Sequence, residues 1–257
     1  MISPRTKIIL VGFQSQHLHN PMYYFLCHLS STDIFLSTCV VPNLLCALLN
    51  DGQPMSLYGC IGQLFCTGFF TAVECFILTI MSYDRYLAIC NPLHYIRVMN
   101  VSHRIHLITW SWMLSLLICL VIISQMFPLE ICGSNIIDNI YCDLSPLLDI
   151  SCENTFMLEM LVTVLSIPSI VFPFLFIIFS YIYIFLTILK ISSTIGRQKA
   201  FSTCSSHLIV VCTYYIILIA KYTVPSRRQW SISRHTYGPI LVQPLYPTIM
   251  LLINSIT

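Results

Sequence analysis

Long apolar runs separated by short polar segments make up most of this chain. Six runs are near or above the ~20 residues that a helix needs to cross a bilayer, at residues 22–49, 57–83, 105–127, 157–189, 200–222 and 237–257. They are continuously apolar and do not alternate every second residue, so they predict helices rather than barrel strands. We therefore expect an all-α membrane protein, with residues 1–257 forming one transmembrane helical bundle domain.

The composition supports the same class. Hydrophobic residues make up 57% of the chain and charged residues 9%, whereas soluble domains carry about 25% charged residues. Residues 1–20 lack the apolar core of a secretory signal peptide. Basic residues are too few for a nucleic-acid partner, and no histidine pair has metalloprotease spacing. We expect no catalytic residues and no enzymatic activity.

Charge is distributed unevenly between the loops. The segments after the second and fourth runs contain the basic residues Arg85, Arg97, Arg104, Lys190, Arg197 and Lys199. The loop at residues 125–155 is acidic and has no Lys or Arg. Since Lys and Arg concentrate on cytoplasmic loops, we expect the Arg85 end in the cytosol. The basic residues within 221–234 would lie on the other side and disagree with this orientation.

Four of the 13 cysteines differ from the rest, most of which lie within the apolar runs. Cys132, Cys142 and Cys152 follow one another at ten-residue intervals in the acidic loop, and Cys60 opens the second span on the same side. Cysteines in a non-cytosolic loop indicate an oxidising compartment and disulfide bonds. A zinc site is the competing interpretation, although this loop has no His and no C-x-x-C spacing.

Two carboxylic acids, Asp33 and Glu74, lie near the middle of apolar runs. An ionisable residue inside a membrane span is a functional candidate, because an uncompensated charge there is costly. Alternatively, both are protonated and hydrogen-bonded within the bundle. A transporter or channel could use them as a proton or cation path, but the inverted repeats or broken helices typical of transporters are absent from the sequence.

The triplet Asp84, Arg85 and Tyr86 stands where the second apolar run ends. Charges at a membrane boundary are readily hydrated and can exchange partners, so this triplet suggests a conformational switch. The simpler interpretation is that Arg85 anchors the helix at the lipid headgroups.

Several segments together resemble the olfactory receptors, a branch of the rhodopsin-like G-protein-coupled receptors. They are PMYYFLCHLSSTD at 21–33, MSYDRYLAICNPLHY at 81–95, SYIYI at 180–184 and KAFSTCSSHL at 199–208. The resemblance implies a multi-pass plasma-membrane receptor that binds a small, mostly apolar odorant and activates a stimulatory, olfactory-type G protein. It also implies the disulfides Cys60–Cys142 and Cys132–Cys152.

The chain departs from the family pattern at both ends. ILVGF at 9–13 is followed almost directly by HLHNPMY at 17–23, although these segments normally flank the first of seven transmembrane helices. Six spans are therefore expected here. The family's Asn-Pro-x-x-Tyr motif is replaced by Asn254 and three further residues at the C-terminus. A truncated product that does not signal is accordingly the alternative within the family.

The resemblance also assigns roles to residues. Asp33, with Glu74 and Asn254, would form a possible sodium site, and no other cofactor is expected. Asp84, Arg85, Tyr86, Tyr181, Lys199 and His207 would form the G-protein switch. The outer halves of the second, fourth and fifth spans would line the odorant pocket, with Gly68 providing space. The candidate ligand contacts are Thr67, Gly68, Thr71, Leu165, Ser166, Ser169, Tyr215, Leu218, Ile219 and Tyr222.

Overall fold

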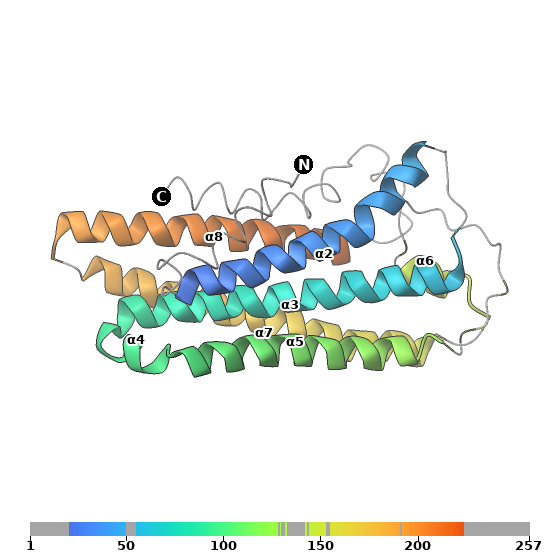
Figure 1. The fold of residues 1–257 in the computed structure, drawn as a ribbon, viewed down its shortest axis with the longest axis horizontal. Helices are drawn as coiled ribbons and strands as arrows, with labels where there is room; N and C mark the ends of the chain where they lie inside the picture. The colour runs from blue at the N-terminus through green and yellow to red at the C-terminus, as the bar shows by residue number, and fades with distance from the viewer. Residues whose placement is uncertain are drawn as a thin grey trace.

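The structure of the chain is a bundle of long helices (Figure 1). This computed structural model describes residues 21–49, 55–127, 129, 132, 142, 144–152, 155–190 and 192–223. The helices in these residues are α2 (Pro21–Leu49), α3 (Leu57–Cys90), α4 (Pro92–Val98), α5 (Val101–Ser124), α6 (Leu144–Asp149), α7 (Phe156–Leu189) and α8 (Thr194–Thr223). The prediction of an all-α membrane bundle is confirmed.

The long helices α2, α3, α5, α7 and α8 occupy five of the predicted spans, and the sixth, 237–257, lies outside the described residues. Within the described part of the chain, four helical segments are long and apolar enough to cross a membrane: Pro21–Asn43, Leu57–Cys90, Val101–Ser124 and Phe156–Leu189. These segments account for the mostly apolar composition of the chain.

Local sequence sets the boundaries of α3, α4 and α5. The Ser56 hydroxyl accepts a hydrogen bond from the Gly59 N–H over 3.1 Å and caps α3, and the Asn100 side chain caps α5 through the His103 N–H over 2.8 Å. Asn91 ends α3 because the proline at 92 disfavours a helical conformation at the preceding residue. The helix α3 therefore continues past the predicted span at 57–83, and the Asp-Arg-Tyr triplet lies within α3.

The helix α3 is central in the bundle, with most of its interhelical contacts to α2, α5 and α7. The larger core contains the fully buried side chains of Phe25, Ile77, Ile177 and Tyr215, from α2, α3, α7 and α8. A smaller core near the start of α3 joins α3, α5, α6 and α7. Because α3 passes through both, it connects the two ends of the bundle.

The outer faces of α5 and α7 carry many exposed apolar side chains. Trp110 on α5 is 71% exposed, and Phe172 on α7 is 70% exposed. In water such surfaces would be unfavourable, whereas lipid tails solvate them well. These faces are therefore suited to contact with the hydrocarbon of a bilayer.

Candidate functional site

A disulfide fixes the first turn of α3 to the loop that follows α5. Cys60 is bonded to Cys142, with their Cα atoms 5.3 Å apart, and Cys132 is bonded to Cys152 at a Cα separation of 5.4 Å. These are the two pairs that the family resemblance implies. The first bond closes a sequence separation of 82 residues, so it ties a long segment to the end of the bundle.

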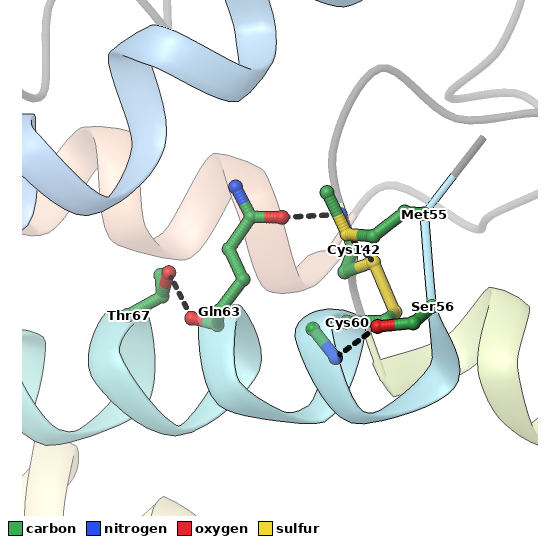
Figure 2. The surroundings of a disulfide bond; sticks show 7 residues. Met55, Ser56, Cys60, Gln63, Thr67 and Cys142 are labelled. Carbon is green, nitrogen blue, oxygen red and sulfur yellow. Dashed lines mark hydrogen bonds between the residues drawn. A yellow bond between two sulfur atoms is a disulfide. The ribbon is translucent and has the colours of Figure 1, made fainter. Parts of the chain in front are cut away.

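The amide of Gln63 lies beside Cys142, to one side of the first disulfide (Figure 2). Its Oε1 accepts a hydrogen bond from the Cys142 N–H over 3.3 Å, and the side chain is 5% exposed. One turn further along α3, the Thr67 hydroxyl donates to the Gln63 main-chain carbonyl over 2.8 Å. The polar contact between α3 and this loop thus involves a residue that was not among the sequence-based candidates.

The candidate ligand residues of α3 have different surroundings. Thr71 is buried, and its main-chain carbonyl accepts a hydrogen bond from the Tyr214 hydroxyl of α8 over 3.1 Å. Gly68 is exposed, and among the described residues a Cβ built on it would come near the Cys119 Sγ of α5, at 3.8 Å. This glycine therefore faces α5, and its expected role in providing pocket space stays a prediction.

The remaining candidate ligand residues lie on α7 and α8. Leu165, Ser166 and Ser169 are partly buried on α7, and the Ser169 hydroxyl donates to the Ser166 carbonyl over 2.9 Å. Tyr215 and Leu218 are buried on α8, where the Tyr215 ring packs 4.9 Å from that of Phe174. The side chains of Ile219 and Tyr222 are outside the described atoms.

Asp33 and Glu74 come together in the middle of the bundle. Asp33 on α2 is 7% exposed and Glu74 on α3 is 3% exposed. The Glu74 carboxyl interacts with the side chains of Asp33 and Tyr214. The pair is therefore shared by α2, α3 and α8. Asn254, the third predicted sodium ligand, lies outside the described residues.

At the other end of α3, Asp84 is held by α4. The Tyr95 hydroxyl donates to Asp84 Oδ1 over 3.0 Å, and Asp84 is 2% exposed. Burial is the main cause that raises the pKa of Tyr95, and the neighbouring Asp84 raises it further. Arg85 is also within electrostatic reach of Asp84, so this carboxylate has both Tyr95 and Arg85 as partners.

Arg85 lies close to a buried polar contact between α7 and α8. The Tyr181 hydroxyl and Nδ1 of His207 are hydrogen-bonded, and their rings stack with centroids 5.8 Å apart. Both side chains are within electrostatic reach of Arg85. Tyr86 packs edge-on against Tyr183 of α7 at 6.3 Å. The structure thus brings together the predicted switch residues of α3, α7 and α8, except Lys199, whose side chain is not described.

Sequence reasoning missed three polar residues that contact these sites. Tyr95 closes the motif at 81–95, so the motif itself could have indicated it. Gln63 is the only amide side chain between residues 57 and 90, a detectable exception in an apolar run. Tyr214 adjoins the candidate Tyr215 and gave no separate indication.

Helices of membrane-spanning length, a disulfide-tied loop at one end and an Asp-Arg-Tyr triplet with a buried Asp84 at the other are the features of a helical membrane receptor. A family model described as olfactory receptor matches residues 2–256. The chain therefore belongs to the olfactory receptor family, whose members are G-protein-coupled signalling receptors and not enzymes.

Individual relatives agree with this assignment. The chain is 41% identical over 239 residues to olfactory receptor 8H3 of Homo sapiens, covering 93% of this chain and 76% of that receptor. It is 43% identical over 221 residues to olfactory receptor 5P62 of Mus musculus, covering 86% and 70%. Olfactory receptor 10J4 of Homo sapiens is 37% identical over 250 residues, covering 97% and 78%.

Proposed function

We propose that this receptor binds a small, mostly apolar odorant at the plasma membrane and activates a stimulatory, olfactory-type G protein. The observation that carries the proposal is the position of Arg85, beside the Tyr181–His207 contact that joins α7 to α8. If odorant binding favours a bundle in which α7 and α8 separate at this end, Arg85 becomes accessible to the partner.

The surface beside Arg85 supports a protein partner. On α4, Leu93 is 92% exposed and Ile96 is 84% exposed, and this helix lies outside the predicted spans. Exposed apolar side chains beside a basic residue suit a partner that offers an apolar pocket with acidic groups. This end of the bundle therefore has the chemistry of a G-protein contact.

The opposite half supports the ligand class. On α3, Phe65 stacks on Phe69, and Phe70 packs against Phe69 at a tilt; on α8, Tyr215 and Leu218 are buried. Apolar surroundings with few polar groups favour small molecules of low polarity. The proposal therefore specifies a mostly apolar odorant.

We include the sodium site in the proposal. Asp33 and Glu74 supply two buried carboxyl groups in contact, and the Glu74 Oε1 atom has no hydrogen-bond donor among the described residues. They fit a monovalent cation in charge, with further oxygens needed to complete its shell. These two residues would hold the ion, and the ion would favour one arrangement of α2, α3 and α8. Odorant potency that does not change with sodium concentration would contradict this part.

The test is expression of the chain with the stimulatory G protein and measurement of cyclic AMP across a panel of small apolar odorants. We expect at least one odorant to raise cyclic AMP, and Arg85→Ala to abolish the response at equal surface expression. Surface labelling of a tag inserted between α2 and α3, at the end of the bundle opposite Arg85, separates this proposal from the non-signalling alternative. A receptor present at the surface that gives no response to the panel would contradict the proposal.

A further inference from the structure

The Gln63 amide has a fixed orientation. Its Oε1 accepts from the Cys142 N–H at 3.3 Å, and exchanging oxygen and nitrogen would place two donors opposite each other. Nε2 is therefore directed away from the disulfide, as Figure 2 shows. This assignment leaves both Nε2 hydrogens for another acceptor.

No acceptor for Nε2 is present among the described residues, although the atom is buried and the side chain is 5% exposed. Native proteins satisfy the great majority of buried polar side-chain atoms, and each exception needs an explanation. The Cys142 contact uses only the carbonyl oxygen, so a role in holding the loop does not account for the amide nitrogen.

Three hydroxyls on α3, α7 and α8 already direct their hydrogens to main-chain carbonyls. Thr67 donates to the Gln63 carbonyl at 2.8 Å, Ser169 to Ser166 at 2.9 Å, and Tyr214 to Thr71 at 3.1 Å. A hydroxyl has one hydrogen to donate, so these groups offer a ligand only acceptor capacity. The Gln63 amide therefore supplies a donor that these three hydroxyls do not.

We propose that Nε2 of Gln63 donates a hydrogen bond to a carbonyl oxygen of the odorant, so that the receptor prefers aldehydes, ketones or esters to hydrocarbons of the same size. The proposal rests on the proposed odorant-binding function and specifies its ligand class. Engaging one Nε2 hydrogen with a ligand oxygen reduces the unfavourable burial of this donor, whereas a hydrocarbon leaves it in full.

The experiment measures cyclic AMP responses of the full chain with the stimulatory G protein to straight-chain aldehydes and to terminal alkenes of equal carbon number. Gln63→Glu keeps an acceptor for the Cys142 N–H while replacing the amide donor, and Gln63→Met removes both. The matched control is Gln125→Glu, the same change at an exposed position just after α5. Surface expression is measured for each.

We expect the wild-type receptor and Gln125→Glu to prefer the aldehydes, and both Gln63 variants to lose about tenfold of this preference. An aldehyde-to-alkene potency ratio that is the same in the wild type and in either surface-expressed Gln63 variant would overturn the proposal.

A second readout separates this proposal from the signalling function. Purified receptor is labelled with a photoreactive long-chain alkene, and unlabelled aldehyde competes. Competition in the wild type that is lost in Gln63→Met supports the donor role even if no G protein is activated. Equal competition in both proteins, or none in the wild type, overturns it.

Discussion

The Tyr95 hydroxyl donates a hydrogen bond to Oδ1 of Asp84 over 3.0 Å, so the short helix α4 is joined to α3 next to Arg85. The Asp84 carboxylate therefore has Tyr95 as a hydrogen-bond partner and Arg85 as a nearby positive charge, while Arg85 is also within electrostatic reach of Tyr181 and His207. Tyr95 therefore influences which partner Arg85 has.

Replacing Tyr95 by phenylalanine tests this relationship. Without the phenol, the buried Asp84 carboxylate gains most by pairing with Arg85, which withdraws the arginine from the partner side. We expect about a tenfold loss of odorant potency, in keeping with a hydrogen bond to a charged group. Cyclic AMP at matched surface expression is the measurement. Tyr58→Phe, at a position 75% exposed, is the control, and unchanged or increased potency in Tyr95→Phe would refute the interpretation.

The same contact has a defined pH dependence. Burial first, and then Asp84, raises the pKa of Tyr95 above its ordinary value of about 10. A group whose pKa is raised on folding contributes stability that is complete below the unfolded value and lost only as pH rises through the folded value. The difference in thermal stability between the wild type and Tyr95→Phe should therefore be constant from about pH 6 to 9. A difference that disappears within this range would show that another group controls the contact.

Tyr214 joins α8 to α3 through the Thr71 carbonyl and lies 3.4 Å from the Cys75 Sγ. Removing its buried hydroxyl in Tyr214→Phe should destabilise the receptor by about 1–2 kcal/mol, because these groups lose a polar partner. Thermal unfolding in detergent measures the effect. Tyr23→Phe, which changes a 51% exposed tyrosine on α2, should have no effect, and equal melting temperatures for both variants would count against a structural role of the Tyr214 hydroxyl.

The two disulfides should differ in their contribution. The Cys60–Cys142 bond spans 82 residues and the Cys132–Cys152 bond spans 20. In the chain-entropy description the longer loop gives the larger stabilisation, by about 1 kcal/mol. We expect replacement of Cys60 and Cys142 together by serine to lower the melting temperature more than replacement of Cys132 and Cys152. The reverse order would mean that local contacts, not loop length, dominate.

Gly68→Ala should be tolerated. The added methyl group meets the Cys119 Sγ at 3.8 Å, an ordinary van der Waals distance, and alanine favours helix by about 1 kcal/mol over glycine. Odorant potency should stay within about twofold of the wild type, since the methyl group lies against α5. A selective loss of larger odorants would return Gly68 to the pocket.

Much of the architecture could be predicted because lipid imposes simple requirements. Apolar runs of spanning length located α2, α3, α5, α7 and α8, and the charged residues that follow the runs set the expected ends of the spans. The helix α3 continues past the predicted span end at 83, because a helix can extend beyond the hydrocarbon until its backbone is interrupted at Asn91.

The sites were less predictable. The family resemblance predicted that Arg85, Tyr181 and His207 would lie together. The contacts of Gln63 and Tyr214 could not be predicted, because they depend on helix rotation and interhelical distance. A helical phase error of one residue turns a side chain by about 100°, so the sequence alone did not show that Gly68 faces α5. Hydrogen bonds between different elements, such as those from the Cys142 N–H to Gln63 and from Tyr214 to Thr71, depend on the same details of rotation and distance.

The helix α3 is held covalently to a loop at its first turn and by Tyr95 near its last. A helix restrained at both ends cannot easily slide or rotate, so α3 should move less than the other helices. Displacement on ligand binding must then be concentrated in α8, which touches α3 over few positions. Experiments that measure distances between labelled helices should therefore place one label on α3, whose position is expected not to change when ligand binds.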